Sequence, residues 1–246
     1  MTEPQSESVE TLPPASRPAY EPAPPAAPRA AAAAVAASST GDLMRTVLRV
    51  AWLSIGLGMA LEVLVLTVAA YSGTQGSSPK PFVADLAHKV SWSFLVCVGL
   101  AFGTAAGKAR SAVMGFLGLI SAPVAFTAAR SLHKGVSAAM GLAGTVAAGP
   151  SPLVIALLKA VEYGFLGAAL GRLGKGARGS LGSYVALGIL TGIVFGGTII
   201  GVTVAAGAKA DLVSLLSRGI DEVLFPLGCS LVLYAADAIG KRLAPG

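Results

Sequence analysis

Residues 153–173 read LVIALLKAVEYGFLGAALGRL, an apolar run with three charged side chains among its 21 residues. At about 1.5 Å per residue, a helix of this length crosses the roughly 30 Å hydrocarbon core of a bilayer. Similar runs recur on both sides of it. The sequence therefore predicts an all-α membrane protein built as a six-transmembrane-helix bundle, with spans at about 43–71, 82–107, 111–129, 153–173, 182–207 and 212–236.

The composition supports a membrane environment for most of the chain. Hydrophobic residues make up 54% of the 246 residues and charged residues only 12%, whereas an ordinary globular protein is about 25% charged. The net charge of +6 is spread over short segments between the apolar runs, so it forms no basic patch of the kind that binds nucleic acid. We therefore expect the lipid bilayer, and no nucleic acid, as the partner.

The first 40 residues differ from the rest of the chain. They hold eight prolines among alanine, serine and glutamate residues, and Tyr20 is their single aromatic residue. Such a segment lacks the apolar surface that would offset its entropy cost of ordering, so residues 1–40 are predicted to be a disordered tail and residues 41–246 the transmembrane domain. A proline-rich docking segment for a partner protein is the alternative interpretation of the tail.

Lysine and arginine are unevenly distributed between the two sides of the predicted bundle. With the tail inside, nine of them flank the inner ends of the spans and four flank the outer ends. Because an excess of these residues in short loops marks the cytoplasmic side, both termini are predicted to be cytoplasmic in a cell membrane, either inner or plasma membrane. The nine are Arg45, Arg49, Lys108, Arg110, Arg172, Lys175, Arg178, Lys241 and Arg242, and the four are Lys80, Arg130, Lys134 and Lys209.

Two further patterns concern how the chain is organised. The stretches 88–95, 159–166 and 218–225 resemble one another, each with basic and polar residues followed by a bulky apolar pair. Three tandem helical hairpins would explain this likeness, although any helix running from outside to inside shares some of it. Residues 136–148 are apolar but too short to cross the membrane, so they are predicted to be an interfacial or re-entrant segment.

Glycines spaced four residues apart mark three of the spans. Such a spacing places the glycines on one helix face, where it lets two backbones approach closely within lipid. Pro123 and Pro226 are expected to kink the third and sixth spans, because proline removes a backbone donor. The predicted packing glycines are Gly99, Gly103 and Gly107, then Gly167 and Gly171, and finally Gly188, Gly192 and Gly196.

Charged side chains inside the spans are the candidates for function. An ionisable residue at the middle of a membrane is costly, so it is expected to face protein or water and to have a partner. Acid and base three or four residues apart share a helix face, which predicts pairs within single helices. The candidate path residues are Glu62, Lys159, Glu162, Arg218, Asp221 and Glu222.

Residues closer to the predicted span ends are given a simpler role. Asp85, His88 and Lys89 are expected to anchor the second span at the membrane surface, because long charged side chains can reach the interface from a helix end. Trp92, Tyr71 and Tyr184 are expected in the aromatic belt near the ends of the spans.

No motif for an enzyme, a cofactor or a metal is found. The sequence has no His-Glu-x-x-His and no Gly-x-Ser-x-Gly motif, and its two histidines are not accompanied by clustered carboxylates. Cys97 and Cys229 each lie inside an apolar run, where a small packed side chain is the expected role. We therefore expect neither catalytic residues nor a bound metal or cofactor.

Two functional hypotheses follow. In the first, the bundle is a small transporter, permease-like protein or channel for an ion, a proton or a small polar solute, and the buried charges line its path. In the second, it is a non-transporting structural or assembly subunit, which packs through its glycine-rich faces in a homo-oligomer or with a membrane-complex partner.

Overall fold

The computed structural model describes residues 28–71, 80–142, 149–174, 179–208 and 212–243, with side chains from residue 40 onward except at 80, 212–214 and 240–243. Every regular element in these residues is helical. The chain divides into two compact units, residues 1–37 and 38–246, and the fold described below is that of the second unit. Most of the predicted disordered tail therefore lies outside the described residues. Helix α1, however, begins at Pro28, before the expected start near residue 43.

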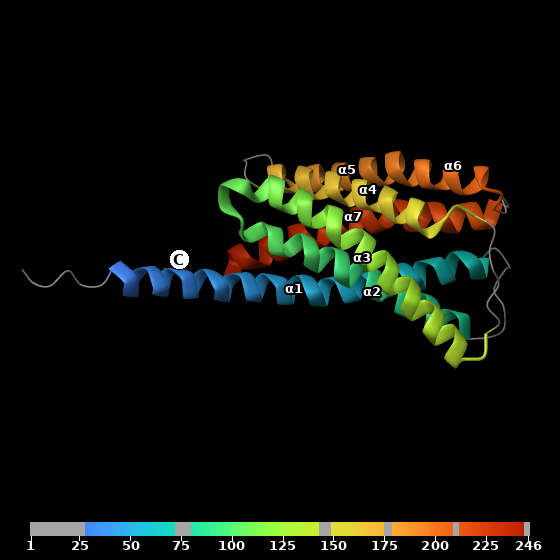
Figure 1. Ribbon diagram of the computed structural model, residues 1–246, viewed down its shortest axis with the longest axis horizontal. Coiled ribbons are helices and arrows are strands. Elements are labelled where there is room, and N and C mark those ends of the chain that lie inside the picture. The colour runs from blue at the N-terminus through green and yellow to red at the C-terminus, as the bar shows by residue number, and fades with distance from the viewer. Residues whose placement is uncertain (1–27, 72–79, 143–148, 175–178, 209–211, 244–246) are drawn as a thin grey trace, which may run out of the picture. The chain divides into compact units, whose positions relative to one another are not determined.

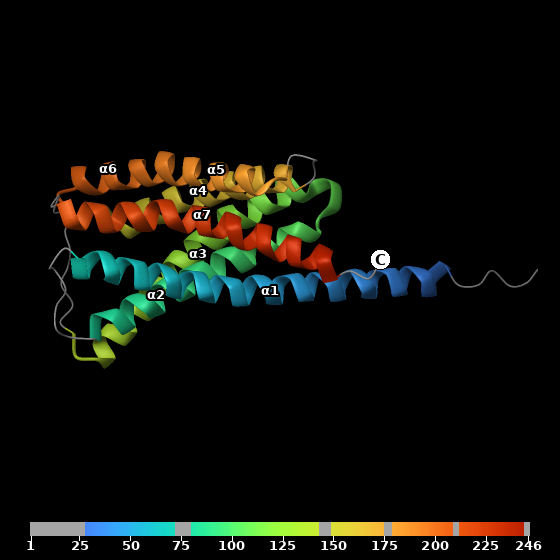
Figure 2. The ribbon, with the colours of Figure 1, turned by 180° about the vertical axis from the view of Figure 1, so that it is seen from behind.

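Six helices are long and apolar enough to cross a membrane, as predicted. Figures 1 and 2 show successive spans running in opposite directions through the second unit. A π-helix at Gly192–Gly196, labelled η3, joins α5 and α6 into the fifth span. The helices are α1 Pro28–Tyr71, α2 Lys80–Phe102, α3 Arg110–Ala139, α4 Pro152–Leu173, α5 Leu181–Thr191, α6 Gly197–Ala205 and α7 Leu212–Leu243.

Helix α3 packs between α2 and α4 through glycines on those two helices. A Cβ atom on Gly99 of α2 would lie 2.5 Å from Ser121, and one on Gly103, the first residue of the 3-10 helix after α2, would lie 2.6 Å from Met114. On α4, a Cβ atom on Gly167 would lie 2.3 Å from the Met114 carbonyl oxygen. A side chain at any of these positions would force the helices apart. Gly171 of α4 has an equally close neighbour in Ser111.

The fifth span packs on α7 in the same way. A Cβ atom on Gly188, Gly192 or Gly196 would lie 2.5 to 2.6 Å from an atom of Leu227, Val223 or Glu222. Gly107 differs from the other glycines predicted to pack. Its φ angle is +50° and its Cβ position is open, so it allows the turn between the 3-10 helices Gly103–Ala105 and Gly107–Ala109.

The third span is longer than expected. Helix α3 continues to Ala139 and ends in a turn at residues 140–142, so residues 136–139 are its last turn and the predicted separate segment at 136–148 is wrong in that part. The other part, residues 143–148, lies outside the described residues. Arg130 and Lys134, which the sequence places at the outer end of the span, therefore lie within α3, before its last turn.

Candidate functional site: a buried charge cluster on four helices

Two lysines, Lys89 on α2 and Lys159 on α4, each pair with two carboxylates. Lys89 Nζ lies 2.8 Å from Glu62 Oε2 and 3.2 Å from Asp221 Oδ1. Lys159 Nζ lies 2.9 Å from Glu162 Oε2 and also pairs with Glu222 Oε2. Because Asp221 and Glu222 are successive residues of α7, that helix joins the two halves. We call Glu62, Lys89, Lys159, Glu162, Asp221 and Glu222 the buried charge cluster.

The local sequence of α4 explains how Lys159 and Glu162 come to face inward. Ser151 caps the helix by accepting a hydrogen bond from the Val154 backbone N–H, and the charged residues follow at a spacing of three, on one face. On the other face, Val161 and Phe165 are about half exposed, as residues that contact lipid would be. The charged face is therefore the one directed into the bundle.

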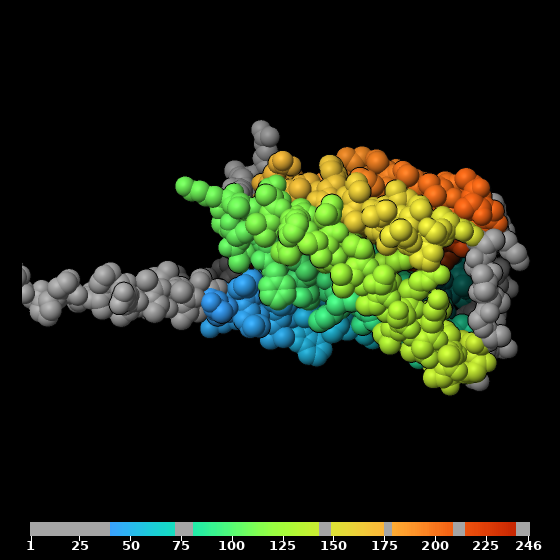
Figure 3. All heavy atoms as spheres, in the orientation of Figure 1, coloured from blue at the N-terminus to red at the C-terminus, as the bar shows by residue number. Residues whose placement is uncertain are grey.

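The cluster is more exposed at α7 than at its deepest carboxylates. The side chains of Asp221 and Glu222 are 29% and 18% exposed, whereas those of Glu62 and Glu162 are 3% and 0% exposed. At the end of the bundle where α7 begins, Figure 3 shows a hollow between the C-terminal end of α3 and the N-terminal end of α4. Within the cluster, exposure is therefore greatest at the two carboxylates of α7 and falls to zero at Glu162.

Glu162 lies at the middle of its span. It follows Pro152 by ten residues and precedes Leu173 by eleven, so about 15 Å of helix separates it from either end. The hydrocarbon core of a bilayer is about 30 Å thick. The fully buried carboxylate therefore lies at the level where a charge is hardest to accommodate.

The cluster holds more acids than bases. Two lysines face four carboxylates, so the formal charge is −2 when every group is ionised. Charges removed from water are tolerated only when they are paired and hydrogen-bonded. A positive species, a proton or water must therefore compensate the excess negative charge.

A layer of aromatic side chains lies against Lys159. The Lys159 Nζ atom is 5.8 Å from the ring centroids of both Trp92 and Tyr163, a cation–π distance. The Trp92 ring also contacts Tyr163 and Phe225, at centroid distances of 5.6 and 6.3 Å. Trp92 is thus inside the bundle, and its predicted place in an aromatic belt is wrong. The same holds for the buried Tyr184, whose ring packs on that of Tyr234.

Where they pass the cluster, α7 contains a proline and the fifth span contains a π-helix. Pro226 of α7 has no backbone N–H, so it cannot donate the helical hydrogen bond to the Glu222 carbonyl oxygen four residues earlier. Opposite this point, the π-helix at Gly192–Gly196 packs on Val223 and Glu222. Single-turn π-helices and proline breaks are frequent where membrane helices move or bind ligands. Glu222 therefore lies between a proline-containing segment of α7 and a π-helix of the fifth span.

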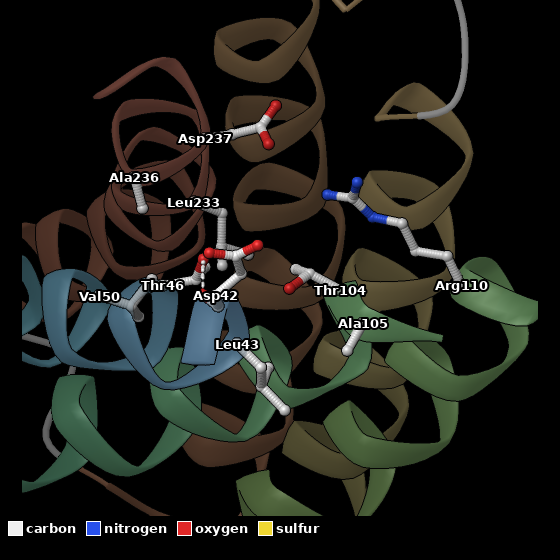
Figure 4. Close-up of a pocket in the computed structure, with 10 residues that line it drawn as sticks. All are labelled: Asp42, Leu43, Thr46, Val50, Thr104, Ala105, Arg110, Leu233, Ala236 and Asp237. Atoms are coloured by element: carbon white, nitrogen blue, oxygen red, sulfur yellow. Dashed lines mark hydrogen bonds between the residues drawn. The ribbon is translucent and has the colours of Figure 1, made fainter. Parts of the chain in front are cut away.

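A second polar space lies at the other end of the bundle. A cavity of about 350 Å³ is lined by parts of α1, α3, α7 and the 3-10 helix after α2. Figure 4 shows the Asp237 carboxylate and the Arg110 guanidinium on two of its sides, with Thr46 hydrogen-bonded to the Asp42 carbonyl oxygen. The lining residues are Asp42, Leu43, Thr46, Val50, Thr104, Ala105, Arg110, Leu233, Ala236 and Asp237.

A buried apolar layer separates this cavity from the charge cluster. Along α7, Glu222 and Leu233 are eleven residues apart, about 16 Å at the rise of an α-helix. Among the described residues, buried and mostly apolar side chains of α2, α4 and α7 fill that interval, and the one serine of α7 there, Ser230, donates its hydroxyl to the Pro226 carbonyl oxygen. The apolar side chains include Val96, Cys97, Leu100, Leu166, Leu170, Phe225, Cys229 and Val232.

Five of the six predicted path residues come together in the cluster, and Arg218 does not. Its side chain is exposed, and among the described residues it forms no ion pair. Asp221 and Glu222 are instead paired with the two lysines of other helices. The expected pairing within α7 is therefore wrong, because the helices approach closely enough to exchange partners.

Lys89 is the cluster residue that sequence reasoning missed. Its position near a span end predicts an interfacial anchor together with Asp85, but Asp85 pairs with His133 of α3 at 3.0 Å, and Lys89 is buried. Helical periodicity contains the missing signal. Lys89 shares a face with Ser93, Val96 and Leu100, at spacings of four, seven and eleven, and all three side chains are inside the bundle.

No protein-family model, no curated protein and no solved structure matches this chain.

Proposed function

We propose that this multi-pass membrane protein is a small transporter or permease-like protein for an ion, a proton or a small polar solute, which passes through the buried charge cluster. The single observation that carries the proposal is an excess of carboxylates at mid-membrane depth. Intramembrane ionisable groups are costly and usually mark ion or substrate paths. A purely structural ion-pair network would need no surplus of negative charge.

The proline of α7 and the π-helix beside Glu222 support the same proposal. Transport requires a change in which side of the membrane reaches the binding site, and in many transporters interrupted helices permit it. Here the cluster is most exposed at the two carboxylates of α7, and the cavity beside Arg110 opens at the other end of the bundle. If α7 bends at Pro226 and moves relative to the π-helix, the packing of the apolar layer between the charge cluster and the cavity beside Arg110 would change.

A set of paired substitutions tests the proposal. Lys159→Met alone should lower the folded yield, because it leaves Glu162 and Glu222 without their base. Adding Glu162→Gln and Glu222→Gln removes all three charges and should restore the yield. A transport site would leave this triple variant folded but inactive, whereas a structural network would leave it active.

A suitable assay can be run before the substrate is identified. Purified protein in proteoliposomes is adsorbed on a solid-supported membrane, and charge movement is recorded after jumps in pH, salts and pools of polar solutes. The matched control is the double variant Asp85→Asn with His133→Gln, which removes a partly exposed ion pair outside the cluster. If no jump moves charge through the native protein, and solute uptake is also absent, the transport proposal fails.

We also propose that both termini are cytoplasmic, in agreement with the excess of lysine and arginine at that end of the spans. Ser180 is exposed at the start of α5. In a variant lacking Cys97 and Cys229, a Ser180→Cys substitution should react with an impermeant maleimide only after the cells are opened. Reaction in intact cells would reverse the orientation.

A structural or assembly subunit is the second candidate function, and one observation favours it. Gly197 and Gly201 are four residues apart on α6, and no atom lies within 4 Å of either Cβ position. This open face could receive a helix of another copy. Cross-linking through Gly201→Cys, in the variant lacking the native cysteines, would support it if the triple cluster variant also kept full activity.

A further inference from the structure

We infer that the cluster takes a proton, bound at Glu162 Oε1, and that the ion handled by the proposed transport function is therefore H⁺. The inference rests on that proposed function for its physiological meaning. Proton binding itself can be measured without any transport assay. In the step, the carboxylate accepts H⁺, an O–H bond forms at Oε1, and no electrons are exchanged.

Among the four carboxylates, Glu162 has the weakest compensation for its negative charge. Asp221 and Glu222 are partly exposed, so water can solvate them. Glu62 and Glu162 each share a lysine with one of those two α7 carboxylates, at 2.8 and 2.9 Å from the lysine nitrogen. Of these two deep carboxylates, Glu162 is the one whose side chain is completely buried. Among the described residues, its Oε1 atom has no hydrogen-bond partner. An added proton removes this uncompensated charge.

The groups around Glu162 leave space for a proton but not for a larger cation. On its own helix it faces Lys159, with Tyr163 next in the chain, and on α7 it faces Glu222 and Cys229. The residues of α3 that pack against this part of α4 are uncharged. A Cβ atom on Gly118 would lie 2.1 Å from the Tyr163 carbonyl oxygen, so the backbones of α3 and α4 touch there and leave no room for an organic cation between these two helices.

A metal ion fits the site less well than a proton. Hard cations require several oxygen ligands converging on one point. Among the described residues, no three histidine, cysteine or acidic side chains have such an arrangement, and the carboxylates of the cluster converge on lysine nitrogens instead. A proton needs one oxygen, and Glu162 Oε1 is free to provide it.

Infrared difference spectroscopy of the purified full-length protein tests the inference directly. Between alkaline and acidic buffer, the native protein should gain the C=O stretching band of a buried carboxylic acid, and the band should shift slowly in D₂O. Glu162→Gln should lose this band. Asp85→Asn, which changes a half-exposed carboxylate outside the cluster, should keep it.

Two results would overturn the inference. The buried band could persist in Glu162→Gln, or the native protein could show no such band between alkaline and acidic buffer. If Glu162→Gln does not fold, Glu162→Asp replaces it, and a shifted band would then support the assignment whereas an unchanged band would contradict it. A native band together with no proton flux in pyranine-loaded proteoliposomes would overturn the transport function and leave proton binding established.

Discussion

The two halves of the buried charge cluster contain the same groups but are assembled differently. In the Lys89 half, the deep carboxylate Glu62 comes from α1, so the lysine connects three helices. In the Lys159 half, the deep carboxylate Glu162 comes from the same helix as the lysine, three residues away. The first half therefore stabilises the tertiary arrangement. The second forms its deep pair within one helix and can change its protonation with less effect on the fold.

The largest effect is expected from Lys89→Met. The substitution leaves Glu62 buried without its base, and removing one partner of a buried pair costs about 3–5 kcal/mol. Thermal unfolding of the purified protein in detergent measures the loss. Adding Glu62→Gln should restore most of it, and Lys159→Met should cost less because Glu162 can take up a proton. Equal losses for the two lysine variants would remove the distinction between the halves.

A pair of glycine substitutions gives the next largest effect. Gly58→Ala places a Cβ atom 2.7 Å from the Val90 Cα atom, one residue from Lys89, whereas Gly196→Ala places one 2.6 Å from the Glu222 Cβ atom. Overpacking of this kind costs about 1–3 kcal/mol. Gly58→Ala should cost more free energy of unfolding, since it meets backbone atoms. Gly196→Ala should instead reduce transport more, because it displaces Glu222 from Lys159.

A smaller change in stability is expected from Glu162→Gln. In acidic buffer, where the inferred proton is bound at Glu162, glutamine has nearly the shape and the charge of the native side chain. The free energy of unfolding under those conditions should therefore change by about 1 kcal/mol or less, the scale of one neutral hydrogen bond. Transport should nevertheless be lost. Glu62→Gln is the matched comparison and should destabilise more, because the pair that it removes joins α1 to α2, whereas Glu162 and Lys159 lie on the same helix. A larger loss of stability in Glu162→Gln than in Glu62→Gln would contradict this description of the halves.

The smallest effect is expected outside the cluster, from Asp85→Asn. The side chains of Asp85 and His133 are 51% and 39% exposed, and exposed ion pairs contribute about 0–1 kcal/mol. Both the midpoint of unfolding and transport should remain close to those of the native protein. A loss comparable to that of Lys89→Met would mean that Asp85 belongs to the functional site.

The sequence was sufficient for the elements and for contacts within a helix, but not for contacts between helices. Apolar length predicts the six spans, and a spacing of three predicts the pair of Lys159 with Glu162. The partners of Lys89 and Glu222 depend on the depth and rotation of separate helices. Those are set by glycine contacts such as Gly58 with Val90. Local spacing therefore paired Arg218 with the acids of α7, which tertiary packing gives to other helices.

The adjacency of Asp221 and Glu222 restricts how α7 can turn. Successive residues of an α-helix point about 100° apart, and here one points to the lysine of α2 and the other to that of α4. A small rotation that shortens one contact lengthens the other, so α7 resists torque in both directions. Breaking either ion pair removes this restraint. Neutralising either Asp221 or Glu222 would thus allow α7 to rotate about its own axis.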